Sequence, residues 1–200
     1  WLPGVAAALD WIHSKGFVHR DVKPGNVMFN AYGQAFLGDF GVAKAFRQDE
    51  EIEFQERYAQ TSTGMIIGTS EYMSPEGVFG EPHDGRSDQY ALAVMVFEAL
   101  TGRRPFIGPT GVAVMLQHSA AVPPSVLEFQ PDLPVEVADA VNRALSKRPE
   151  DRFPDCIHFA RAVLEPLDLA SRLDVRRLAC PVCDVVVKVH ASGVCHSDLA

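Results

Sequence analysis

The chain has 200 residues with a formal net charge of −8, and 47% of its residues are hydrophobic. This length and composition are those of one globular domain that buries a sizeable core. The net acidity without a block of basic residues argues against nucleic-acid binding, and no apolar run approaches the roughly 18 residues of a membrane span.

The first part of the chain predicts a helix followed by a β-hairpin. Residues 1–15 carry Val5, Leu9 and Ile12 on one helical face, and a glycine follows them. Residues 26–29 and 34–38 are short apolar runs separated by a turn-forming tetrapeptide, which is typical of a hairpin. The next segment, residues 43–64, is polar and loop-like, although its first part could form a helix.

The second part predicts a mostly helical arrangement. Residues 87–101 are apolar on nearly every side, so we expect a central, buried helix that begins at Ser87 or Asp88 and ends at Gly102. Residues 121–134 form a proline-rich connector. A further helix is predicted at residues 110–120, and two amphipathic helices are predicted at residues 134–147 and 154–167. The predicted fold class is therefore α+β, mainly helical with short hairpins.

One stretch of the sequence, "GFVHRDVKPGNVMF", places several chemical groups in a single turn. The carboxylate of Asp21 can accept a hydroxyl proton, and the ammonium of Lys23 can steady a phosphoryl group. The amide oxygen of Asn26 suits a hard divalent ion, and the hairpin would return a second acid, Asp39, to its side. One Asp and one Asn on Mg²⁺ is an arrangement that phosphoryl transfer uses.

The order of motifs resembles the protein kinase family. "HRDVKPGN" is similar to its catalytic loop, "DFG" to its metal loop, and "GTSEYMSPEG" to the end of its activation segment. "KRPEDRF" is similar to a late segment whose Arg pairs with the Glu of the P-E motif. The resemblance covers roughly residues 1–165 and implies a kinase-like fold, specifically the large lobe of a bacterial-type (eukaryotic-like) serine/threonine kinase.

The resemblance implies a role for each catalytic group. Asp21 is expected to be the catalytic base, and Lys23 to contact the transferred phosphate of ATP. Asn26 and Asp39 are the expected Mg²⁺ ligands, and Met28 is expected beneath the adenine. A Lys in "DVKPGN" is the serine/threonine form of the loop, so protein substrates with Ser or Thr are implied.

The resemblance also implies supporting residues. His19 is expected to link the catalytic loop to the core, and Thr69 to line the wall that receives the substrate hydroxyl. Asp88 could be a helix cap alone. The resemblance implies that it also forms hydrogen bonds to the backbone of the catalytic loop. Glu76 and Arg152 are expected to form a buried ion pair.

In the family that the chain resembles, an Arg before the catalytic Asp, here Arg20, is typical of control by phosphorylation of the activation loop. The candidate sites are Thr61, Ser62 and Thr63, and the resemblance of the spacing to Thr69 with that of bacterial serine/threonine kinases favours Thr61 and Thr63. Autophosphorylation of this kind implies self-association.

The segment before His19 contains no glycine-rich loop, strand Lys or helix Glu for the nucleotide. We therefore expect the small lobe to lie outside this chain, and the 200-residue chain alone to be nearly inactive. The alternative is a non-catalytic kinase-like scaffold, against which the four intact groups at Asp21, Lys23, Asn26 and Asp39 argue.

The end of the chain departs from the kinase pattern. We divide the sequence into a kinase lobe (1–168), a linker (169–179) and a cysteine-containing tail (180–200). Two interpretations of the tail stay open: a partial zinc ribbon or knuckle, which would make it a zinc-binding adaptor, or spare thiols. The candidate zinc ligands are Cys180, Cys183, His190 and Cys195. The kinase part is expected in the cytoplasm, with any membrane anchor outside this chain.

Overall fold

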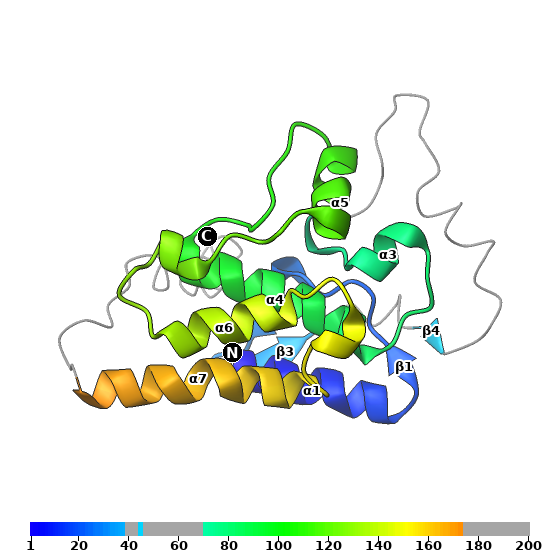
Figure 1. Ribbon diagram of the computed structural model, residues 1–200. Helices are drawn as coiled ribbons and strands as arrows, with labels where there is room; N and C mark the ends of the chain where they lie inside the picture. Colours follow the sequence, from blue (N-terminus) through cyan, green and yellow to red (C-terminus); the bar gives the residue numbers. More distant parts are fainter. Residues whose placement is uncertain (39–43, 46–69, 174–200) are drawn as a thin grey trace, which may run out of the picture.

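The computed structural model describes residues 1–38, 44–45 and 70–173 (Figure 1). Within these described ranges, four short strands form two antiparallel pairs, and helices make up most of the rest. The helices are α1 (Leu2–Ser14), α3 (Pro75–Phe79), α4 (Gly85–Thr101), α5 (Gly111–Ala120), α6 (Val135–Ala144) and α7 (Cys156–Leu173). The mainly helical α+β class predicted from the sequence is confirmed.

Helix α4 forms the centre of the core. Twelve of its 17 residues are buried, and it contacts α1, α6 and α7. Helix α7 lies alongside α1 and α6 in Figure 1, and its contacts with both are extensive. The prediction of a central helix that is apolar on nearly every side is therefore confirmed.

The start of α4 differs from the prediction. The helix begins at Gly85, and Asp84 is its N-cap, accepting a hydrogen bond from the Arg86 amide at 2.7 Å. Ser87 and Asp88 are therefore not caps but residues of the first turn. Because Asp84 satisfies the helix end, their side chains are available for bonds to other segments.

The β-hairpin is formed as predicted. Strand β2 (Val27–Phe29) pairs with β3 (Ala35–Leu37), with Met28 opposite Phe36. The second pair joins β1 (Phe17–Val18) to β4 (Lys44–Ala45). Short 3₁₀ turns complete the fold: η1 (Pro24–Asn26), η3 (Ser70–Tyr72), η4 (Val126–Glu128) and η5 (Pro149–Asp151).

A carboxylate on α1 holds the beginning of α7. Asp10 accepts hydrogen bonds from the backbone amides of Cys156 at 2.9 Å and Ile157 at 2.8 Å. Helix α7 then continues to Leu173. Among the described residues, no helix has the length and apolar character needed to cross a bilayer.

Candidate active site

The catalytic-loop candidates lie between β1 and β2, and their backbone is held by α4. The Asp88 carboxylate accepts hydrogen bonds from the amides of His19 and Arg20, both at 2.8 Å. Arg20 has a φ of 64°, in the left-handed region that costs a non-glycine residue roughly 1–3 kcal/mol. The two bonds from Asp88 fix this strained turn, and with it the path of the residues that follow.

His19 connects the same loop to the hairpin. Its side chain is fully buried, and Nε2 donates to the Gly38 carbonyl at 3.0 Å while Nδ1 accepts from the Asp21 amide at 3.3 Å. The ring therefore lies between the turn that carries Asp21 and the end of β3. These contacts fit a structural role and leave no ring nitrogen for proton transfer.

Asp21, Lys23 and Asn26 lie together. Lys23 Nζ is 2.8 Å from Asp21 Oδ2, and Asn26 Nδ2 donates to the same oxygen at 3.0 Å. Asn26 Nδ2 also donates to the Asp21 carbonyl at 2.7 Å. The second carboxylate oxygen, Oδ1, makes no hydrogen bond within the described part of the chain.

The orientation of the Asn26 amide decides whether this loop suits a metal ion. Both groups that Nδ2 approaches are acceptors, so the nitrogen must face Asp21 and the oxygen Oδ1 must face the other way. An amide oxygen presented in this way is a ligand that Mg²⁺ accepts. The residues present therefore fit the ion that the sequence implied.

The hairpin returns the chain to Asn26. The Gly38 amide donates to the Asn26 carbonyl at 2.7 Å, which places the residue before Asp39 beside the catalytic loop. Asp39 itself lies outside the described residues, as do Thr61, Thr63, Thr69 and the four candidate zinc ligands Cys180, Cys183, His190 and Cys195. Met28 and Phe36 are exposed on the hairpin.

Glu76 and Arg152 form a bidentate salt bridge. Nη1 and Nη2 of Arg152 each donate to one Glu76 oxygen at 2.8 Å, and both side chains are almost completely buried. Ser87 Oγ donates to Glu76 at 2.6 Å. Burial opposes the charge on Glu76, but Arg152 and Ser87 outweigh it and lower its pKa. The pair joins α3 to the loop after α6.

Several residues near the site carry no motif and were not predicted. His13 on α1 bonds Asp88, and Tyr72 on η3 donates to Glu98 on α4 at 2.6 Å. Among the described residues, one group has metal-ligand chemistry: Asp10, His13 and Cys156, with ligand atoms within 4.8 Å of one another. Its carboxylate already caps α7 and its imidazole bonds Asp88, so we interpret it as structural.

Asp21, Lys23 and Asn26 thus lie together on a loop whose backbone is held by Asp88, in the arrangement that the resemblance to the protein kinase family predicts. The family model described as the protein kinase domain matches residues 1–167, and this chain belongs to that family.

The relatives are bacterial. The chain is 37% identical over 186 residues to the serine/threonine-protein kinase PknF of Mycobacterium tuberculosis, covering 90% of this chain and 37% of that protein. It is 38% identical over 156 residues to PknA of the same species, covering 78% of this chain and 33% of PknA. The chain thus spans about a third of these relatives.

A solved structure agrees in fold. The crystal structure of the M. tuberculosis PknI kinase domain matches with a TM-score of 0.59 and 33% identity. The match covers 82% of this chain and 53% of that kinase domain. The described residues therefore share their arrangement with about half of a kinase domain.

Proposed function

We propose that the protein to which this chain belongs is a serine/threonine kinase that moves the γ-phosphoryl group of ATP to protein Ser and Thr hydroxyls. The observation that carries the proposal is the group of Asp21, Lys23 and Asn26, fixed on a loop whose backbone is held by Asp88. A kinase-like scaffold has no chemical need for this group.

Each of these residues has a chemical task in the proposed reaction. The substrate hydroxyl oxygen forms a bond to the γ-phosphorus, and the bond from that phosphorus to the bridging oxygen of ADP breaks. The hydroxyl proton passes to the Asp21 carboxylate, whose Oδ1 accepts no other proton within the described residues. Lys23 holds Asp21 Oδ2 at 2.8 Å and supplies positive charge beside the transferred group.

The nucleotide and the metal have their own residues. Asn26 would hold Mg²⁺ through Oδ1, together with Asp39, and Met28 would lie against the adenine. When bound, the ion neutralises the charge of the phosphates. Asn26 also steadies Asp21 through two hydrogen bonds, so its amide has a structural function as well.

Regulation and location complete the proposal. Phosphorylation at Thr61 and Thr63, in a self-associated form, would introduce negative charge near Arg20. The reaction with ATP places this part of the protein in the cytoplasm. Mass spectrometry of the active full-length protein tests the phosphorylation, and an unmodified segment would remove it.

Zinc in the tail remains a separate prediction. Cys180, Cys183, His190 and Cys195 would hold one ion in a site independent of the catalytic group. Metal analysis of the purified full-length protein decides between a zinc knuckle and spare thiols. A stoichiometric ion that is lost when Cys180 and Cys183 are replaced by Ser supports the knuckle.

A transfer assay on the natural full-length protein tests the proposed function. Radiolabelled ATP is supplied with matched peptides that differ only in a central Ser, Thr or Tyr. We expect label on the Ser and Thr peptides, dependence on Mg²⁺, and little label on the Tyr peptide. A protein that binds partners but transfers no phosphoryl group would instead be the scaffold.

A further inference from the structure

Helix α5 lies outside the main hydrophobic core. It packs against α3 and the η3 turn, and in Figure 1 it stands apart from α1 and α7. Of its ten residues, Val114 and His118 are the buried ones. The helix is therefore not part of the main core, and α3 and η3 are its principal partners.

His118 makes the polar part of this attachment. Its side chain is fully buried, with Nε2 at 3.0 Å from the Glu71 carbonyl and Nδ1 at 3.0 Å from the Tyr90 hydroxyl. A carbonyl only accepts, so Nε2 must carry the proton and donate to Glu71. Nδ1 then accepts from the Tyr90 hydroxyl, and one neutral tautomer satisfies both bonds.

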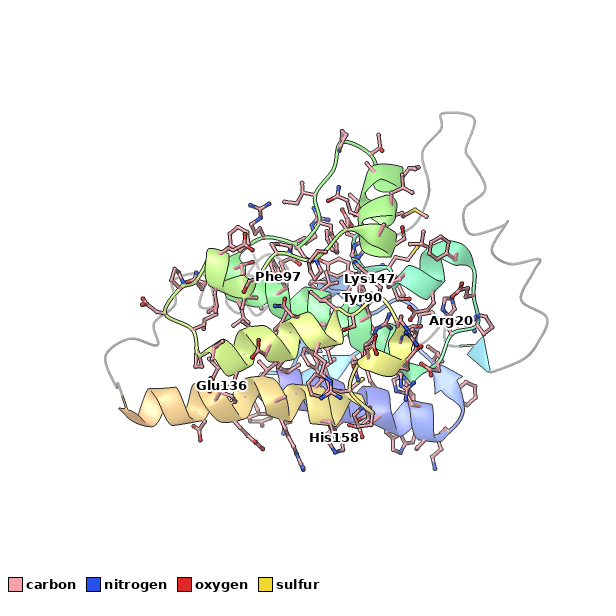
Figure 2. The ribbon with its side chains drawn as sticks, in the orientation of Figure 1. Arg20, Tyr90, Phe97, Glu136, Lys147 and His158 are labelled. Carbon is pink, nitrogen blue, oxygen red and sulfur yellow. The ribbon has the colours of Figure 1, made fainter. Side chains whose placement is uncertain are left out.

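The surroundings of the ring favour a single position. The ring lies edge-on to Tyr90 and Phe106, with centroids 5.7 and 4.9 Å away. Lys147 Nζ donates a hydrogen bond to the backbone carbonyl of His118 at 2.8 Å. In Figure 2 Tyr90, in the first half of α4, and Lys147 are labelled next to each other. The imidazole and its own backbone are thus held by α4 and by the segment after α6.

The Glu71 carbonyl that His118 bonds belongs to the η3 turn, Ser70–Tyr72. The Glu71 carboxylate pairs with Arg104, and the Tyr72 hydroxyl donates to Glu98 at 2.6 Å. These two bonds hold side chains of the turn, whereas His118 forms a hydrogen bond to a backbone carbonyl of the turn, that of Glu71. The turn directly follows Thr69, the residue expected in the wall that receives the substrate hydroxyl.

We propose that His118 is a positioning residue for the protein substrate, because it locks the backbone of η3 to both α5 and the buried Tyr90. The inference rests on the proposed kinase function. His118 does not touch the reacting atoms. It sets the path of the η3 turn, which follows Thr69 in the sequence, and it joins that turn to α5.

Four variants of the full-length protein separate positioning from general stability. His118→Phe keeps the aromatic packing but removes both hydrogen bonds. His118→Gln keeps an amide donor at about the reach of Nε2, so it can still bond the Glu71 carbonyl. Tyr90→Phe removes only the Nδ1 partner. His158→Phe, at an exposed position on α7, is the matched control.

Two measurements read out the effect. For His118→Phe we expect the KM for a Ser peptide to rise about tenfold, with the KM for ATP unchanged, because the part-buried Glu71 carbonyl loses its donor. Hydrogen exchange of the amides at residues 70–73 should rise by about the same factor, while the amides of α4 remain protected. Tyr90→Phe should shift both measurements less than His118→Phe, because the bond to the Glu71 carbonyl stays in place, and His118→Gln and His158→Phe should stay near wild type.

Either of two results overturns the inference: an unchanged peptide KM in His118→Phe, or exchange that rises equally in α4, α6 and residues 70–73. If His118→Phe does not fold, His118→Asn, whose amide is too short for the bridge, replaces it. If the wild-type protein transfers no phosphoryl group, the proposed function fails. The exchange measurement then still decides whether His118 couples α5 to η3.

Discussion

His13 and Asp88, 75 residues apart in the sequence, lie in direct contact: Nε2 of the imidazole is 2.7 Å from Oδ2 of the carboxylate. The same carboxylate holds the amides of His19 and Arg20. His13 also faces Asp10, the residue that caps α7. A chain of polar contacts therefore runs from the start of α7 through α1 and α4 to the candidate catalytic loop.

The charge on His13 predicts how stability depends on pH. Burial opposes the charge, but Asp10 and Asp88 outweigh it and raise the pKa of His13 from 6.5 to about 9. A raised pKa contributes stability that is complete below pH 6.5 and is lost as the pH rises toward 9. The shift corresponds to a contribution on the order of 3 kcal/mol.

His13→Gln removes this titration. Hydrogen exchange of the buried α4 amides, measured between pH 6 and pH 9 and corrected for intrinsic rates, should show a flatter loss of protection in the variant. His158→Gln, an exposed histidine on α7, is the control and should follow the wild type. Parallel profiles for His13→Gln and wild type would contradict the assignment.

Gly85 gives a prediction in which helix propensity and packing oppose each other. Alanine is favoured over glycine in a helix interior by up to about 1 kcal/mol, and part of this preference applies at Gly85, the first residue of α4. A Cβ at position 85, however, would lie 2.5 Å from Nδ1 of His13. We therefore expect Gly85→Ala to destabilise the protein, because His13 must leave Asp88.

A second variant identifies the cause. The His13→Ala background removes the ring that clashes, so Gly85→Ala should there become neutral or stabilising in urea unfolding. If Gly85→Ala costs the same amount in both backgrounds, the clash with His13 is not the cause.

The Glu76–Arg152 pair predicts a large effect for removal of one partner. Arg152→Met leaves the buried Glu76 charge with Ser87 alone and should lower the free energy of unfolding by roughly 3–5 kcal/mol. The double variant Glu76→Gln/Arg152→Met removes the stranded charge and should recover part of this loss. Urea midpoints check both values. A double variant less stable than Arg152→Met would contradict the explanation.

The contribution of His118 to stability depends on pH in the opposite direction from that of His13. Burial lowers its pKa from 6.5 to about 4, and Lys147 and Arg104 act in the same direction, against the bond to Glu71. The unfolded chain therefore takes up the proton first, and stability falls as the pH drops from 6.5 toward 4. His118→Phe does not titrate, so its stability should fall less over this range. Urea midpoints at pH 7, 5.5 and 4.5 check the difference in slope.

The sequence predicted those parts of the site that depend on local spacing. Asp21, Lys23 and Asn26 lie within six residues, so one turn brings them together, and the hairpin was visible as two apolar runs. The buried helix was also predicted, because its apolar character needs no knowledge of its partners. Its first residue was not, because Asp84 acts as the cap and leaves Ser87 and Asp88 for distant partners.

Contacts between distant segments could not be predicted in this way. His13 and His118 appear in the sequence as single histidines on amphipathic helices, without a spacing that indicates a partner. Their functions arise from Asp88, Glu71 and Tyr90, which only the fold brings near. The same holds for Asp10, whose contact with Cys156 joins positions 146 residues apart.

The most direct test of the central claim is phosphoryl transfer to a Ser peptide by the full-length protein and its Asp21→Asn variant. Asn cannot accept the hydroxyl proton but keeps nearly the same shape and can still lie beside Lys23 and Asn26. We expect kcat to fall by about 10²–10⁴-fold with an unchanged urea midpoint. Equal kcat in the two proteins would contradict the role of Asp21, and absence of transfer in the wild type would contradict the kinase assignment.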